Sequence, residues 1–332
     1  MTALIEVKNL TLQFRTDEGL ITAVDNVSFS LDKGEVMGLV GESGSGKSVT
    51  AKSLMHLNAG NAVYGPDSSI VLQTENGPVD VLSLRKPSEL QVVRGGAISM
   101  IFQEPMASFA PAISIGKQMV EQLQLHGQMS KARAKEISVE MLDRVGISDP
   151  SDRFNQYAFE LSGGMRQRAM IAMALSTQPK LLIADEPTTA LDVTIQAQVI
   201  DLMKDLVDEF HMGIIFITHD LGVVAQTADK VSVMYLGRLI EEGTVRDVIR
   251  TPKHPYTQGL LAALPKLDDL ESALTPVPGD IPSPLERPSG CVFHTRCSQT
   301  VGPQCNTAVP SGTMLGGGHR VACHIFDQEV AQ

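Results

Sequence analysis

The residues with the clearest chemical pattern are eight consecutive positions that match GxxxxGK[ST] and read GESGSGKS. Glycines in such a loop let successive backbone N–H groups turn inward around an anion. Lys47 would place a positive charge beside the β- and γ-phosphates of a nucleotide, and Ser48 would offer its hydroxyl to Mg²⁺. The positions expected to contact a nucleotide are Gly41, Glu42, Ser43, Gly44, Ser45, Gly46, Lys47, Ser48 and Val49.

Two carboxylates follow a short apolar run later in the chain. The segment KLLIA at 180–184 leads directly into Asp185 and Glu186. Beside a phosphate loop, Asp185 would bind Mg²⁺ directly or through water, and Glu186 would polarise the attacking water as a general base. An acidic pair at a strand end is common by itself, so this interpretation depends on its combination with the loop.

The elements that must position these residues alternate between short apolar runs and longer helical patterns. The loop lies between a strand expected at 35–40 and a helix expected at 47–57, and an N-terminal pair of strands is expected at 4–14 and 22–31. Residues 58–95 are polar and predict an antiparallel excursion. The remaining expected strands are 97–102, 181–184 and 214–218, and the expected helices are 115–145, 162–175 and 194–210. This alternation predicts an α/β fold with a parallel sheet and crossover helices.

Composition excludes several classes of protein. The chain has 332 residues, of which 43% are hydrophobic and 20% charged, as in ordinary globular proteins. Its longest apolar run has seven residues, far short of the about 18 that span a bilayer. The N-terminus lacks a basic segment followed by an apolar one, so we expect no secretory signal and a cytoplasmic protein. The net charge of −11, without a Lys/Arg stripe, argues against a nucleic-acid partner.

A second glycine-containing loop, LSGGMRQR at 161–168, precedes the carboxylate strand. A serine there would cap a helix, and the two glycines would let the backbone approach an anion at the positive end of the helix dipole. The segment resembles the LSGGQ signature of the ATP-binding cassette (ABC) family, with methionine at the fifth position. The matching residues are Leu161, Ser162, Gly163, Gly164 and Met165.

Further residues match elements of the cassette in chain order. The resemblance implies that Gln103 contacts Mg²⁺ and the attacking water, that Asp192 belongs to the D-loop, and that His219 contacts the γ-phosphate. Phe14 resembles the aromatic residue that stacks on adenine, although tyrosine is more usual there and a core position is the alternative. The resemblance therefore implies ATP and Mg²⁺ as ligands, with Glu186, His219 and Gln103 as the catalytic residues.

The resemblance covers residues 4–250 and implies a P-loop NTPase fold: a mixed sheet with crossover helices, an antiparallel β subdomain and a helical subdomain at about 104–175. We therefore expect one nucleotide-binding domain over residues 1–250. In this family two such domains pair head to tail, so a second ABC ATPase subunit, either a paralogue or a copy, is an implied partner. The other implied partners are two transmembrane permease subunits, which would dock on the helical subdomain.

The remaining residues, 251–332, are named here the C-terminal extension. The segment TPKHPYT at 251–257 resembles the junction in ATPase subunits of oligopeptide and dipeptide importers. QEPMASFAP at 103–111 resembles the same subgroup, with Phe109 and Ala110 where Leu and Asn are usual. The resemblance implies ATP-driven peptide uptake at the cytoplasmic face of the plasma membrane, served indirectly by an extracytoplasmic solute-binding protein. Seven prolines at 276–310 predict an irregular segment tethered to the cassette.

Three alternatives for the function stay open from the sequence. The same ATPase role could serve nickel, glutathione or another small solute, because the solute contacts other chains. A soluble ABC protein acting on ribosomes or DNA is less favoured, since the chain has one cassette, no heptad run and no basic surface. A nucleotide-gated regulatory module with negligible turnover is the third.

All four cysteines lie in the last 42 residues, namely Cys291, Cys297, Cys305 and Cys323. Disulfides are disfavoured in a reducing cytosol, and structural zinc sites prefer closely spaced Cys pairs that are absent here. Four thiolates at looser spacing can hold a [4Fe–4S] cluster, which some members of the resembled subgroup carry. A cluster is the first expectation; free thiols in a small packed lobe, and zinc, stay open.

Overall fold

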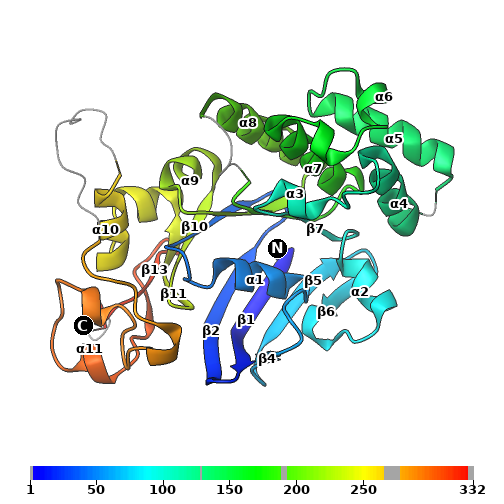
Figure 1. Ribbon diagram of the computed structural model, residues 1–332. Coiled ribbons are helices and arrows are strands. Elements are labelled where there is room, and N and C mark those ends of the chain that lie inside the picture. Colours follow the sequence, from blue (N-terminus) through cyan, green and yellow to red (C-terminus); the bar gives the residue numbers. More distant parts are fainter. Residues whose placement is uncertain (1–2, 128, 188–192, 265–276, 328–332) are drawn as a thin grey trace.

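The computed structural model of the chain describes residues 3–127, 129–187, 193–264 and 277–327. Two sheets form the centre of this part of the chain. Figure 1 shows helices from the middle of the chain, coloured green, gathered at one side and the C-terminal segments, coloured orange, at the opposite side. The phosphate loop therefore lies in a body that is flanked by two additional groups of elements.

The larger sheet is built around buried parallel strands. Its order is β12-β13-β11-β10-β3-β9-β8-β7, and all pairs from β10 to β7 are parallel. The parallel strands are β3 (Val36–Val40), β7 (Ile98–Ile101), β8 (Leu181–Asp185), β9 (Gly213–Thr218) and β10 (Lys230–Tyr235). Every residue of β7, β8 and β9 is buried, as expected for strands covered on both faces. The predicted parallel sheet is therefore confirmed.

An antiparallel sheet carries the N-terminal segments. Its order is β2-β1-β5-β6, with β4 paired to β1. The strands are β1 (Ile5–Thr16), β2 (Gly19–Leu31), β4 (Ala62–Tyr64), β5 (Ser69–Thr74) and β6 (Gly77–Asp80). The predicted hairpin and the antiparallel excursion after residue 58 are both present. Two short elements that were not expected, η1 (Val81–Ser83) and α2 (Pro87–Val93), lead back to β7.

Helices lie on both faces of the larger sheet and in a group at one side of it (Figure 1). They are α1 (Lys47–Leu54), α3 (Pro105–Ser108), α4 (Ile115–Gly127), α5 (Lys131–Arg144), α6 (Pro150–Arg153), η2 (Ala158–Glu160), α7 (Gly163–Ser176), α8 (Val193–Phe210) and α9 (Leu221–Thr227). In α4 the buried residues Ile115, Met119 and Leu123 recur at helical spacing and join the core that holds α5 and α7. A second core joins α1 to the antiparallel sheet. Among the described helices, none has the length and apolar character needed to cross a bilayer.

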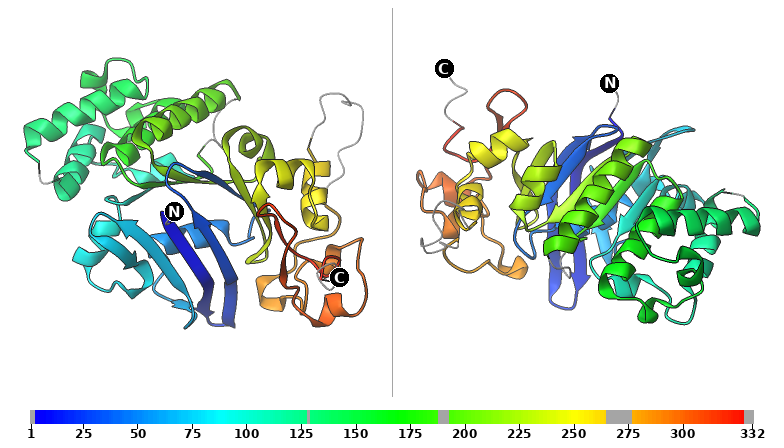
Figure 2. Two further views of the ribbon diagram at one scale, coloured as in Figure 1. Left: turned by 180° about the vertical axis from the view of Figure 1, so that it is seen from behind. Right: turned by 90° about the horizontal axis from the view of Figure 1, so that it is seen from above.

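The C-terminal extension is packed against the cassette. Strand β13 pairs with β11, with Glu241 opposite Val321, so the extension continues the larger sheet. The elements from β11 onward are β11 (Arg238–Thr244), η3 (Arg246–Arg250), α10 (Pro255–Ala262), η4 (Pro284–Glu286), η5 (His294–Arg296), α11 (Gln304–Thr307), β12 (Gly312–Met314) and β13 (Arg320–Ala322). Both views of Figure 2 place these segments beside β10 and β11. The prediction that the extension is only tethered to the cassette is therefore wrong, because strand pairing between β13 and β11 fixes the extension to the sheet.

An aromatic cluster adds to this attachment. Tyr235 at the end of β10, Tyr256 of α10 and Phe293 lie with ring centroids 4.7–5.3 Å apart. All three are at most 2% exposed, and they belong to one apolar core with Val292 and Leu236. Aromatic rings carry much of the apolar area that a small core can bury. The extension thus shares a hydrophobic core with the cassette.

Candidate functional site

The phosphate loop connects β3 to α1 with a backbone that glycine favours. Gly41, Gly44 and Gly46 have φ values of 152°, 77° and 98°. A Cβ at Gly41 would lie 2.2 Å from the carbonyl oxygen of Met234, and one at Gly46 would lie 2.6 Å from that of Ala23. These positions therefore exclude any side chain, and the loop can wind tightly before α1 begins.

Lys47 lies inside this loop. Its Nζ donates to the carbonyl oxygens of Gly41 at 2.7 Å and Glu42 at 3.0 Å. Burial lowers the pKa of Lys47, and the nearby carboxylates of Glu186, Asp185 and Glu42 oppose that shift. The ammonium group is thus held at the loop by carbonyl oxygens and acidic neighbours, where a phosphate would be paired with it.

Ser48 and Asp185 bring two oxygen ligands together. Ser48 Oγ donates to Asp185 Oδ1 at 3.1 Å, although 137 positions separate them in the chain. Burial raises the pKa of Asp185, and the hydrogen bond from Ser48 opposes this shift. A hydroxyl and a carboxylate at one point are the hard oxygen donors that Mg²⁺ binds, so the residues fit the expected ion.

Three predicted catalytic residues meet at the ends of three neighbouring strands. Gln103, after β7, donates through Nε2 to Glu186 Oε2 at 2.9 Å. His219, after β9, has Nδ1 3.1 Å from Glu186 Oε1. Glu186 follows β8 with φ 47° and donates its backbone N–H to Ile217. Both carboxylate oxygens of Glu186 are therefore oriented by neighbours, as a group that activates water must be.

A cavity of about 240 Å³ adjoins the loop. Its walls are the loop itself, Gln103 and Glu186 on one side and residues 21–23 of β2 on another. Phe14 is not one of the lining residues; its side chain is half-buried and packs against the core of the antiparallel sheet. Its stacking on adenine stays a prediction.

Residues of the C-terminal extension that no sequence pattern indicated also reach this site. Pro284 and Arg287 line the cavity, and Arg287 pairs with Asp25 at 3.1 Å. Arg296 contacts Glu42 of the phosphate loop. No local pattern marks these residues, because each contact joins segments more than 200 positions apart.

The signature residues lie at the start of α7. Ser162 caps this helix, and its Oγ accepts the backbone N–H of Met165 at 3.3 Å. Leu161 is buried and Met165 packs against the core, whereas Ser162 and Gly163 are exposed. The signature loop is not part of the cavity at Lys47. Asp192 lies outside the described residues.

The four cysteines converge on one small cavity in the extension. Cys291, Cys297, Cys305 and Cys323 all line it, together with histidines that include His324. Burial raises the pKa of three of these thiols, and that of Cys323 reaches about 11. None is in a disulfide. Within the described residues, however, no group of three or more metal-ligating side chains has a geometry that could hold a metal ion. The expected cluster is therefore not supported by the ligand geometry.

Two protein-family models match the chain. The ABC transporter model matches residues 24–189, and the model of the oligopeptide/dipeptide transporter C-terminal region matches residues 240–305. The first range holds the phosphate loop, Asp185 at the end of β8, and Glu186 after it. The second holds three of the four cysteines.

Similar proteins cover the whole chain. The oligopeptide transport ATP-binding protein AppD of Bacillus subtilis is 46% identical over 100% of this chain and 99% of its own length. The dipeptide transport ATP-binding protein DppD of the same species is 45% identical over 99% of this chain and 96% of its own length. The solved dimeric structure of a bacterial ABC transporter cassette aligns with TM-score 0.64 and 26% identity, over 73% of this chain and 99% of the other. This chain belongs to the ABC transporter family of ATP-binding proteins.

Proposed function

We propose that this chain binds MgATP at its phosphate loop and hydrolyses it, as the ATPase subunit of a membrane importer for di- or oligopeptides. The hydrolytic part rests on the contacts that Gln103 and His219 make with the Glu186 carboxylate. The solute class rests on the similarity to oligopeptide and dipeptide transport proteins. An importer for nickel, glutathione or another small solute is the alternative.

The chemistry assigned to each residue follows from its position. The loop N–H groups and Lys47 bind the phosphates, and Ser48 and Asp185 hold Mg²⁺, which neutralises phosphate charge when bound. Glu186 accepts a proton from the attacking water as the water oxygen bonds to the γ-phosphorus, and the bond from that phosphorus to the β–γ bridging oxygen breaks, which releases ADP and phosphate. Gln103 and His219 hold the carboxylate toward that water.

The partners belong to the same proposal. A second ABC ATPase subunit, copy or paralogue, would receive residues 162–164 at its own nucleotide. Two transmembrane permease subunits would contact the helical subdomain at about 104–175, at the cytoplasmic face of the plasma membrane, and a solute-binding protein would act indirectly. We assign the cassette to residues 1–250 and the C-terminal extension to residues 251–332.

Replacing the general base tests the hydrolytic role. In the assembled transporter we expect Glu186→Gln to reduce ATP turnover by about 100-fold or more while MgATP still binds. Glu104→Gln is the matched control, because this exposed carboxylate lies one residue from Gln103. Unchanged turnover in Glu186→Gln would exclude Glu186 as the general base.

Transport by the reconstituted complex tests the solute. We expect ATP-dependent accumulation of a labelled dipeptide or oligopeptide in proteoliposomes that hold the permease subunits and the solute-binding protein. Labelled nickel and glutathione serve as competing solutes in the same assay. Accumulation of either, without peptide accumulation, would replace the peptide assignment and leave the ATPase role intact.

A [4Fe–4S] cluster stays a separate proposal. Its support is the convergence of four cysteines on one cavity, and the absence of ligand geometry within the described residues stands against it. Iron and acid-labile sulfide, measured after anaerobic purification, decide the question. About four of each per chain would establish the cluster, and values near zero would leave free thiols or zinc.

A further inference from the structure

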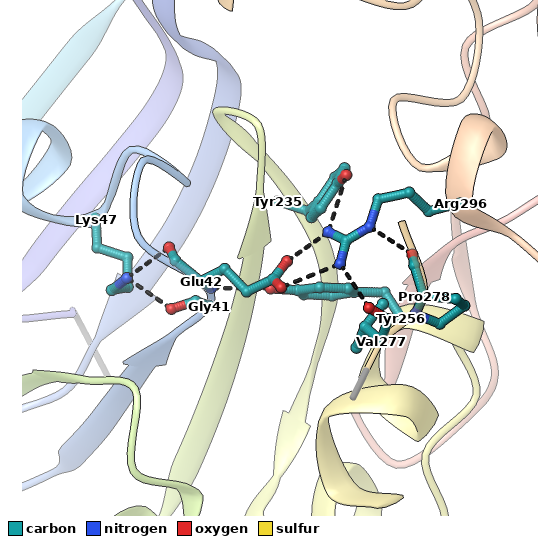
Figure 3. Close-up of polar contacts among 8 residues, drawn as sticks. All are labelled: Gly41, Glu42, Lys47, Tyr235, Tyr256, Val277, Pro278 and Arg296. Atoms are coloured by element: carbon teal, nitrogen blue, oxygen red, sulfur yellow. Dashed lines mark hydrogen bonds and ion pairs between the residues drawn. The ribbon is translucent and has the colours of Figure 1, made fainter. Parts of the chain in front are cut away.

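Glu42, the second residue of the phosphate loop, turns its side chain away from Lys47 and toward the C-terminal extension (Figure 3). Its carboxylate pairs with Arg296 through two bonds, Nη1 to Oε2 at 2.7 Å and Nη2 to Oε1 at 3.2 Å. Parallel bonds between a guanidinium and a carboxylate fix the orientation of both groups. The two residues are 254 positions apart.

Arg296 is itself held in place by hydrogen bonds to four different residues. Its Nε donates to the carbonyl of Pro278 at 2.9 Å, Nη2 to that of Val277 at 3.1 Å, and Nη1 to the Tyr235 hydroxyl at 3.4 Å. With the two bonds to Glu42, all five guanidinium donors have an acceptor. The side chain is only 4% exposed. Burial works against the charge, yet the hydrogen bonds that Arg296 donates to Glu42 and Tyr235 raise the pKa of Arg296, so it stays a cation.

The backbone of Glu42 is also fixed by the extension. Its N–H donates to the hydroxyl of Tyr256 at 2.9 Å, and Tyr256 is fully buried in α10. Its carbonyl oxygen accepts the Nζ of Lys47 at 3.0 Å. The backbone of one residue, Glu42, therefore connects the extension to the lysine that would bind phosphate, as Figure 3 shows.

We propose that Arg296 and Tyr256 of the C-terminal extension are positioning residues for the phosphate loop, which hold Glu42 so that the loop is preorganised for nucleotide. The inference rests on the nucleotide binding proposed above and adds a role for the extension in it. A loop already held in its binding shape loses less conformational freedom when the ligand arrives. The extension thereby influences the nucleotide affinity of the cassette through Glu42, without contacting the phosphates itself.

The test measures MgATP affinity in three variants of the full chain. Glu42→Gln removes the charge that Arg296 binds, Arg296→Gln removes its partner, and Tyr256→Phe removes one hydroxyl while keeping the buried ring. We expect each to raise the Kd for MgATP by about 5- to 20-fold. We expect the double variant Glu42→Gln/Arg296→Gln to bind about as weakly as either single variant, because both remove the same interaction.

Two matched controls separate positioning from general loss of stability. Glu242→Gln neutralises a buried carboxylate paired with Lys230 between β10 and β11. Tyr64→Phe removes a half-buried tyrosine hydroxyl that accepts from Asn58 Nδ2 at 3.0 Å in the antiparallel sheet. We expect both controls to keep the Kd within about twofold of the unmodified chain. Thermal unfolding without nucleotide shows which variants are folded.

Three results would overturn the inference. They are an unchanged Kd in folded Glu42→Gln and Tyr256→Phe, an equal rise in Kd in Glu242→Gln, and additive effects in the double variant. If Arg296→Gln does not fold, Tyr256→Phe still decides, since it keeps the ring packing. Absence of MgATP binding by the unmodified chain would instead remove the proposed function on which the inference rests.

Discussion

At the scale of single residues, the site depends on contacts between polar atoms that only the fold brings together. The Ser48 hydroxyl donates to Asp185, a carboxylate that is 5% exposed. Burial penalises its charged form, and for that reason its pKa is raised. A divalent cation would reverse this preference, because it favours the ionised carboxylate. In the proposed function, Ser48 and Asp185 would therefore bind the ion as a pair.

Removing the hydroxyl of Ser48 should weaken Mg²⁺ binding more than ATP binding. We expect Ser48→Ala to raise the Mg²⁺ concentration for half-maximal ATP turnover by about 10-fold, since one oxygen ligand is lost. A titration of turnover with MgCl₂ at saturating ATP measures this shift. Ser53→Ala is the control, because Ser53 is buried in the same helix and donates to the carbonyl of Val49. An unchanged requirement in a folded Ser48→Ala variant would exclude Ser48 as a ligand.

The structure brings together residues that the sequence predicted for the site, whereas the sequence did not indicate the residues that surround them. The phosphate loop and the pair after β8 have local signatures, because the spacing of glycines and the end of an apolar run are visible in short segments. The contact of Arg296 with Glu42 has none, since it depends on how α10 and the residues around η5 pack against β10. A buried arginine in a polar segment cannot be distinguished from an exposed one by residue type alone.

At the scale of elements, the start of α10 shows how the extension is stabilised. His254 caps this helix, and its Nδ1 accepts the N–H of Tyr256 at 3.1 Å. The ring is 1% exposed and lies 5.8 Å from that of Phe293. Burial lowers the pKa of His254 to about 3. The folded state therefore holds a neutral histidine at any pH near neutrality.

This histidine should make stability depend on pH. The unfolded chain binds a proton at His254 below about pH 6.5, whereas the folded chain does so only near pH 3. Between these values the unfolded state holds more protons, so stability falls as the pH falls. From pH 7 to pH 5.5 the loss at this one site is on the order of 1 kcal/mol. We expect His254→Asn, which keeps a capping oxygen, to reduce that loss in denaturant titrations at the two pH values.

An exposed histidine provides the comparison. His211 has φ 49° and is exposed, and asparagine tolerates this backbone conformation. His211→Asn should therefore keep the full pH dependence of the unmodified chain. Equal slopes in His254→Asn and the unmodified chain would show that His254 does not carry the effect.

The helix expected at 115–145 is divided into α4, which ends at Gly127, and α5, which begins at Lys131. A second prediction that differs from the structure concerns the C-terminal extension. The proline content of residues 276–310 did predict short, irregular elements, since η4, η5 and α11 have three or four residues each. It did not predict attachment, because β12 and β13 have three residues each, which is too few to reveal a strand pattern in the sequence. Strand β13 pairs with β11 and so satisfies an edge of that strand, and β12 pairs with β13.

At the scale of the whole molecule, the nucleotide cavity and the signature loop are separate surfaces of one chain. The loop at the start of α7 exposes Ser162 and Gly163, and the cavity at Lys47 is lined by other residues. Helix α7 is long enough for its first N–H groups and its dipole to attract an anion. In the proposed pairing, that anion is the nucleotide held by a second subunit.

A substitution at Gly163 tests this pairing without disturbing the chain that carries it. A Cβ at Gly163 meets no atom within 4 Å, so Gly163→Asp should fold and bind MgATP as the unmodified chain does. In the assembled transporter we expect ATP turnover to fall by about 10-fold or more, because the new carboxylate would face the phosphates of the opposite site. Gly60→Asp is the matched control, since Gly60 is exposed and also has open space at its Cβ. Turnover that is unchanged by Gly163→Asp would mean that the signature loop does not face a nucleotide, and the subunit would then hydrolyse ATP with its own residues alone.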